Sequence, residues 1–289
     1  MWFFYYQNYI DCIYFIMYVA DLHNDFLTEI KTEKQQIKYL STLPLAAKHI
    51  VCAVWTSKLK TNEILSLLYS ANETINSLNM KSTLKIAIED FWFVSKDNYQ
   101  LIKKIKPIYV GLTWNNNNLL AGGAMENGEV TKLGEYYINK LNRDKITIDT
   151  SHLNEKSFMQ VASLSRKIIC SHTAFSGVYD CYRNLKDYQI RTIIDMHGII
   201  GLCFVSDFLN GTKHATIEDV CKHIEYFFDR FGDDNICLGT DFYGSKHLPK
   251  GIKNYENISK IKELLIKKGY SEKSVAKLFY RNYEKFIGV

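Results

Sequence analysis

The sequence VADLHND, at residues 19–25, carries the pattern that decides the fold. It starts with apolar residues and ends with His23 and Asp25, which the two-residue repeat of a β-strand places on the same side. Seven further short runs, rich in apolar and β-branched residues, follow it and are separated by longer amphipathic segments. These runs occupy residues 49–55, 83–89, 107–113, 145–152, 167–172, 199–205 and 235–241.

The segments between the runs are predicted to be helices. Thr61 is positioned to cap a helix over residues 62–77, and Ser271 is positioned to cap the last helix of the chain. Mostly apolar strands suit a sheet that is covered on both faces. Strand–helix alternation eight times over predicts a single α/β domain, a (β/α)8 TIM barrel, over residues 17–289. The alternative is an open doubly wound sheet, but no GxGxxG turn follows the first strand.

The composition excludes several classes of protein. Of the 289 residues, 47% are hydrophobic and 23% are charged, which excludes a disordered or collagen-like chain. The 36 basic and 31 acidic residues give a net charge of only +5, so nucleic-acid binding is not expected. The seven cysteines form no CxxC pair, which favours a reducing, cytoplasmic setting. The oligomeric state is left open, and a homodimer is one option.

Residues 1–16 form an apolar N-terminal extension whose status the sequence leaves open. The segment lacks the basic start and the small-residue cleavage site of a signal peptide. Gln7, Asn8 and Asp11 interrupt it, so stable membrane insertion is not expected. Three interpretations compete: upstream sequence translated ahead of a start at Met17, a packed extension, or membrane contact. We favour the first, and we expect a chain that begins at Met17 to be soluble and active.

Ionisable residues are concentrated at the ends of the predicted strands. Glu89, His152, His172 and Asp241 end the third, fifth, sixth and eighth runs, as His23 and Asp25 end the first. Enzymes with this barrel carry their sites at the carboxyl ends of the strands. A lone buried histidine is usually a hydrogen-bonded core residue, but five strands that end in histidine or carboxylate are hard to attribute to core polarity.

This set of residues suits a metal-dependent hydrolase. Three histidines and two or three carboxylates match the nitrogen and oxygen ligands of a zinc-like site. A carboxylate that bridges two ions would suit hydrolysis, because the ions polarise a carbonyl and lower the pKa of a bound water. An amide leaving group also needs a proton carrier that is not a ligand. Asp241 is the candidate for that role.

Six short strings carry a resemblance to a known family, in the family's order. They are DLHND at 21–25, IAIE at 86–89, DTSH at 149–152, SHTA at 171–174, RNLKD at 183–187 and LGTDFYG at 238–244. They resemble the motifs D-x-H-N-D, the segment of the bridging glutamate, D-x-S-H, S-H-S-x, R-N-x-x-D and G-x-D-F-D-G of the membrane dipeptidase (renal dipeptidase) family. These are zinc peptidases of the amidohydrolase superfamily. The resemblance covers residues 18–286 and is closest to bacterial members.

The resemblance implies a dipeptidase that hydrolyses the peptide bond with a metal-bound hydroxide. It implies two divalent ions, most simply Zn²⁺, and a dipeptide as substrate. His23 and Asp25 would hold the first ion, His152 and His172 the second, and Glu89 would bridge them.

The resemblance also implies which residues touch the substrate. Asp241 would be the general acid/base, and Arg183 would bind the terminal carboxylate of the dipeptide, which suits the planar fork of a guanidinium. The alternative for Arg183 is a surface salt bridge with Asp187. The animal enzymes have L-T-H where this chain has LTWN at 112–115, so Trp114 stands in place of the histidine. Trp114 and Asn115 are expected to contact the substrate. Trp114 can donate one N–H but cannot carry a proton, so its alternative role is an aromatic wall.

The sequence differs from the family pattern in two ways, and two other functions compete with the dipeptidase. Tyr243 replaces the aspartate of the F-D-G motif, and the chain is shorter than the animal members. One rival is another amidohydrolase activity, namely cleavage of lactones, acylated amino acids or D-amino-acid amides. The other is a metal-binding barrel that has lost catalysis, with Trp114 as the substitution responsible for the loss. An intact Asp241 argues against the second, because a non-catalytic metal site has no use for a proton carrier.

Overall fold

The computed structural model describes residues 18–30, 32–77 and 83–289. Eight parallel strands form a closed barrel in the order of the chain, and the first strand pairs with the last. The predicted barrel is therefore confirmed, while the expectations for residues 1–16 lie outside the described residues. The strands are β1 (Val19–Asn24), β2 (Ala47–Trp55), β3 (Thr83–Glu89), β4 (Tyr109–Gly111), β5 (Thr147–Asp149), β6 (Ile168–Thr173), β7 (Ile200–Leu202) and β8 (Ile236–Leu238).

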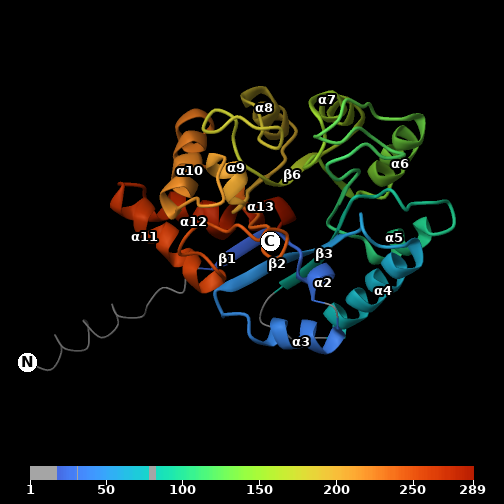
Figure 1. Ribbon diagram of the computed structural model, residues 1–289, viewed down its shortest axis with the longest axis horizontal. Helices are drawn as coiled ribbons and strands as arrows, with labels where there is room; N and C mark the ends of the chain where they lie inside the picture. Colours follow the sequence, from blue (N-terminus) through green and yellow to red (C-terminus); the bar gives the residue numbers. More distant parts are fainter. Residues whose placement is uncertain (1–17, 31, 78–82) are drawn as a thin grey trace, which may run out of the picture.

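Helices surround the barrel, and in Figure 1 the blue β1 lies beside the red C-terminal part of the chain. In the described residues, no helix has the length and apolar character needed to cross a membrane. The helices are α2 (Phe26–Glu29), α3 (Glu33–Ser41), α4 (Thr61–Ser77), α5 (Tyr99–Ile105), α6 (Lys132–Arg143), α7 (Glu155–Leu164), α8 (Asp187–Asp195), α9 (Ser206–Asn210), α10 (Ile217–Phe231), α11 (Ser259–Lys267), α12 (Glu272–Ala276) and α13 (Asn282–Ile287). A 3-10 turn, η1 (Tyr255–Ile258), and a π turn, η2 (Lys277–Arg281), complete them.

The hydrophobic core has two layers, as a barrel requires. The larger one lies between the strands and the helices and includes Ile50, Ile148 and Phe227. The smaller one fills the barrel itself with side chains such as Leu22 and Tyr109, both fully buried. The barrel is therefore a packed core, and its open, functional end is set by the loops beyond the strands.

One of the two predicted helix caps is correct. Ser271 caps α12, where its hydroxyl accepts a hydrogen bond from the backbone N–H of Ser274. Thr61 does not cap α4, because it is itself the first residue of the helix. The carboxylate of Glu63 accepts from the backbone N–H of Lys60 instead, which places the cap one residue earlier than expected.

The fourth, fifth, seventh and eighth strands are shorter than predicted, and in the fifth and eighth this affects a predicted site residue. The fifth and eighth strands end at Asp149 and Leu238, so His152 and Asp241 lie in the loops beyond them. Their φ angles are 68° and 59°, in the left-handed region that a strand does not adopt. Non-glycine residues in this conformation are uncommon and cluster at functional sites.

Candidate active site

The five predicted metal ligands meet at the carboxyl end of the barrel. They come from β1, the start of α2, the end of β3, the loop after β5, and β6. All are buried, and none is more than 6% exposed. Their nitrogen and oxygen atoms fall into overlapping groups that can hold metal ions, namely His23 with Asp25 and Glu89, and Glu89 with His152 and His172. A third group joins His23 and His172 with Asp241.

Irregular pairing turns two of the histidines toward this centre. The register of β1 against β2 shifts between Asp21 and Asn24, and that of β6 against β7 shifts between Cys170 and Thr173. His23 and His172 lie within these shifts. A shift of this kind bends a strand and re-aims a side chain, so it frees each histidine from strict alternation.

Hydrogen bonds at the Nδ1 atoms leave the Nε2 atoms of two histidines available. The Tyr109 hydroxyl donates to the carbonyl of Leu22 at 2.9 Å, so it accepts from His23 Nδ1 at 2.8 Å. The amide oxygen of Asn115 accepts from His152 Nδ1 at 2.7 Å. Such partners fix the tautomer in which Nε2 carries a lone pair for a metal. Asn115, expected to touch the substrate, therefore also orients a ligand.

The carboxylate of Glu89 faces both halves of the ligand set. Its Oε2 lies 3.5 Å from His23 Nε2, and its Oε1 lies 2.8 Å from His152 Nε2. Burial acts to raise the pKa of Glu89, but the close approach of the His152 and His23 rings outweighs it and holds the pKa below its usual range. Glu89 is therefore an ionised carboxylate with one oxygen on each side, the arrangement that a bridging ligand needs.

The donor set fits divalent metal ions. His23 Nε2 and Asp25 Oδ1 are buried and have no hydrogen-bond partner among the described residues, although their side chains approach to 3.2 Å. Buried polar atoms are normally satisfied, so this pair suits coordination. Burial and the charge of Arg183 lower the pKa of His152 to about 4, which keeps that imidazole neutral as a ligand must be.

Asp241 lies beside these ligands with the properties of a proton carrier. Burial raises its pKa well above the usual range, and the nearby carboxylates of Asp25 and Glu89 raise it further. Its loop is held to β1 by Asp21, whose carboxylate accepts from the backbone N–H of Thr240 at 2.8 Å and from the Thr240 hydroxyl at 2.6 Å. Asp241 can therefore hold a proton next to the metal ligands at a fixed position.

Gly244 leaves no room for a side chain at this point. A Cβ on Gly244 would collide with Oδ1 of Asp241 and Oδ2 of Asp25. We expect Gly244→Ala to lower the free energy of unfolding by about 1–3 kcal/mol, the usual cost of overpacking. It should also weaken metal binding, because Asp25 must move. Chemical denaturation and a chelator competition measure both effects, with Lys246→Ala as the control. Unchanged metal affinity in Gly244→Ala would show that this close approach is not needed.

Aromatic side chains line one side of the cavity next to the metal ligands. This cavity has a volume of about 160 Å³ and includes Trp55, Trp114, Phe208 and Asp241 in its wall. The rings of Trp55 and Trp114 pack with centroids 5.2 Å apart, and Trp114 lies 6.0 Å from the ring of His152. Trp114 thus occupies the position of the aromatic wall that the sequence left as an alternative.

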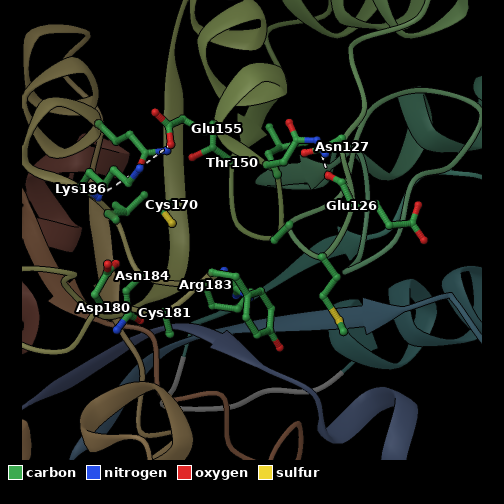
Figure 2. A pocket seen from close by; sticks show the side chains of 17 residues that line it. Glu126, Asn127, Thr150, Glu155, Cys170, Asp180, Cys181, Arg183, Asn184 and Lys186 are labelled. Carbon is green, nitrogen blue, oxygen red and sulfur yellow. Dashed lines mark hydrogen bonds and ion pairs between the residues drawn. The ribbon is translucent and has the colours of Figure 1, made fainter.

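Arg183 contacts two of the candidate histidine ligands and lines a second, larger cavity. Its Nη2 lies 3.3 Å from His152 Nε2 and donates to the carbonyl of His172 at 3.1 Å. Figure 2 shows Arg183 in the wall of a cavity of about 470 Å³, between the loops that follow β4, β5 and β6. A salt bridge from Lys186 to Glu155 spans another part of that wall. The guanidinium therefore connects the metal ligands with a second, polar space.

The salt bridge proposed as the alternative role of Arg183 is wrong. Asp187 instead pairs with Arg230 at 3.3 Å and accepts a hydrogen bond from Tyr226. Among residues 18–30, 32–77 and 83–289, no carboxylate forms an ion pair with Arg183, and its buried Nε has no hydrogen-bond partner. A buried guanidinium without a carboxylate partner is suited to an anionic ligand.

Sequence reasoning missed the residues that support the ligands. Tyr109 was read only as part of a strand, and Asp21 and Asp149 only as letters of motifs. All three are fully or almost fully buried and hydrogen-bonded around the site. A charged residue inside an apolar strand run is the signal that could have found the two aspartates, because buried charge needs partners.

Comparison with known proteins agrees with this geometry. The model of the family described as membrane dipeptidase (peptidase family M19) matches residues 34–288. The dipeptidase tcpJ of Claviceps purpurea is 27% identical over 183 residues, which covers 60% of this chain and 42% of that protein.

Two solved structures share the fold. The dipeptidase AC, a metallopeptidase of family M19, superposes with a TM-score of 0.82 at 20% identity and covers 94% of this chain and 98% of its own. A metallopeptidase from Rhodobacter sphaeroides, solved with a phosphinate mimic of the dipeptide L-Ala-D-Ala, superposes with a TM-score of 0.80 at 19% identity. The match covers 94% of this chain and 99% of that chain. The family match covers most of the chain but leaves out β1 and the candidate ligands His23 and Asp25. Because it spans well over half of the chain, this chain belongs to the membrane dipeptidase family, peptidase family M19.

Proposed function

We propose that this chain hydrolyses dipeptides with two divalent metal ions, most simply Zn²⁺. The observation that carries the proposal is the position of Glu89, whose two carboxylate oxygens face different ligand pairs. His23 and Asp25 would hold one ion on the Oε2 side. His152 and His172 would hold the other on the Oε1 side. When bound, two such ions polarise a carbonyl and supply a hydroxide nucleophile at neutral pH.

The other residues of the site act on the substrate itself. Asp241 would take a proton from the nucleophile and give it to the leaving amine, a role that its raised pKa and its place beside Asp25 support. Arg183 would hold the free carboxylate of the dipeptide. Trp55 and Trp114 would pack against the substrate and restrict water on that side of the cavity.

The position of Arg183 favours a short substrate with a free carboxylate. Its Nη2 is 3.3 Å from His152 Nε2, so a group bound to Arg183 lies close to the metal ligands. A longer peptide would have a further amide in place of the carboxylate. A buried guanidinium without a carboxylate partner would then stay unpaired, which is costly. The arrangement therefore selects dipeptides over longer chains.

Substitution of Glu89 tests the two-metal arrangement. Glu89→Gln should lose both ions on dialysis, because a neutral amide is a poor bridge between two cations. Elemental analysis after dialysis measures this, and wild type should retain about two equivalents per chain. Glu29→Gln is the matched control, since Glu29 lines the same cavity but is exposed. Retention of two ions by Glu89→Gln would contradict the bridging role.

A further inference from the structure

The carboxylate of Asp149 is buried below the histidine ligands and has no part in the proposed reaction. It is 1% exposed, and its Oδ1 accepts from the backbone N–H groups of Ser151 at 3.1 Å and Ser171 at 2.7 Å. The Ser151 hydroxyl donates to the same oxygen at 2.9 Å. The other oxygen, Oδ2, is 2.6 Å from the hydroxyl of Ser171. These contacts fix Oδ2 as the oxygen that faces the hydroxyl of Ser171.

The hydroxyl of Ser171 connects this carboxylate to the ring of His172. Ser171 Oγ lies 2.9 Å from His172 Nδ1. A hydroxyl has a single proton, and the short contact to the Asp149 carboxylate, which accepts three further hydrogen bonds, takes it. Ser171 must then accept the hydrogen bond from His172, so the imidazole carries its proton on Nδ1. The lone pair is left on Nε2, which faces His152 Nε2 at 2.8 Å and Glu89 Oε1 at 3.8 Å.

We infer that Asp149 is a positioning residue that fixes, through Ser171, the tautomer in which His172 can bind a metal. The inference rests on the role of His172 in the proposed function. It goes further because it assigns the donor and the acceptor of each hydrogen bond in the series from Asp149 through Ser171 to His172. We call this series of hydrogen bonds the relay. A carboxylate can only accept from Ser171, and Ser171 can then only accept from Nδ1. The charge of Asp149 thereby determines where the proton of His172 resides.

Asp149→Asn should exchange the donors and acceptors of this relay, while the side chain at position 149 keeps its size and shape. The amide oxygen must take the place of Oδ1, because two backbone N–H groups point at that position. The amide nitrogen then faces Ser171 Oγ and donates to it. The Ser171 hydroxyl is left to donate to His172 Nδ1, and the imidazole proton moves to Nε2, where it blocks coordination. Ser171→Ala should have a weaker effect, because it leaves both tautomers accessible.

The tautomer can be measured without any metal. We would record ¹⁵N spectra of histidine side chains in the full-length, metal-depleted protein and assign the His172 signals from a His172→Gln variant. Wild type should show a protonated Nδ1 on His172, and Asp149→Asn a protonated Nε2. In a separate competition against a chelating dye, Asp149→Asn should lower zinc affinity about 10–100-fold, the usual size of such an effect.

Ser151→Ala is the matched control. Ser151 donates a hydroxyl hydrogen bond to the same carboxylate, lies 3.2 Å from the Ser171 hydroxyl and accepts from the backbone N–H of His172, but it contacts no histidine ring in the described residues. This variant should keep the Nδ1 tautomer and nearly wild-type zinc affinity, whereas a merely structural role of Asp149 predicts similar losses in both. If Asp149→Asn does not fold, Ser171→Ala replaces it, with mixed tautomers and weaker zinc binding expected.

The outcomes separate this inference from the proposed function. Wild type that binds no zinc would refute the metal site, whatever the spectra show. Wild type that binds two ions, with Asp149→Asn unchanged in tautomer and affinity, would overturn the relay alone. Equal losses in Ser151→Ala and Asp149→Asn would also overturn it.

Discussion

Asp241→Asn is expected to keep both metal ions and to lose about 10²–10⁴-fold in kcat, the usual contribution of general acid–base catalysis. The asparagine has the same shape and keeps an oxygen toward the ligands, so the site should stay assembled. It cannot carry a proton, so the leaving amine departs unprotonated. The loss should appear mainly in kcat, because Asp241 acts in the transition state more than in binding.

Metal content and steady-state kinetics on the same preparations check this prediction. Tyr243→Phe is a suitable control, because Tyr243 is in the same loop but 43% exposed and packs on Tyr39. It should change kcat little. Wild-type turnover in Asp241→Asn would refute its role as proton carrier, and loss of a metal ion would show that it is a ligand instead.

Arg183→Ala is expected to lower kcat/KM on dipeptides by at least roughly tenfold. Removal of one partner of a buried charge pair costs about 2–5 kcal/mol, and each 1.4 kcal/mol or so is a factor of ten. Arg183 is buried and lacks a carboxylate partner within the described part of the chain, so the substrate would be that partner. Arg183→Lys should restore only part of the activity, since an ammonium cannot reproduce the planar fork.

A comparison of dipeptides with dipeptide amides checks the prediction and tests the rival function. Amides lack the carboxylate, so they should be poor substrates of wild type and little affected by Arg183→Ala. Arg230→Ala, which removes an exposed arginine from its pair with Asp187, is the control. If wild type cleaves amides and lactones as well as dipeptides, and Arg183→Ala changes no rate, the broader amidohydrolase activity would be favoured.

The barrel and the convergence of the candidate ligands were predictable because both depend on local pattern. Each strand is a short apolar run, and each ligand follows directly on such a run, as Glu89 does at the end of β3. Parallel strands in a closed barrel bring their carboxyl ends together, so the ligands converge without any knowledge of distance. The order of the strings along the chain then pointed to the family.

The supporting contacts were not predictable because they join residues far apart in the sequence. Tyr109 meets His23 across the barrel, and Asp21 reaches Thr240 at the other end of the chain. Because β1 and β6 contain register shifts, strict alternation does not predict which way their side chains point. The C-terminal end of β5 was predicted too late for a similar reason. The left-handed backbone of His152 is set by the loop and not by the apolar run.

Zinc titration of the metal-depleted chain is the most direct test of the central claim. Hydrolysis of a small panel of L,L- and L,D-dipeptides, with L-Ala-D-Ala among them, would be followed as zinc is added to protein of known concentration. We predict no activity without metal and a rise that reaches its plateau at about two ions per chain. Activity that is independent of metal, or its absence when two ions are bound, would contradict the account of this chain as a two-metal dipeptidase.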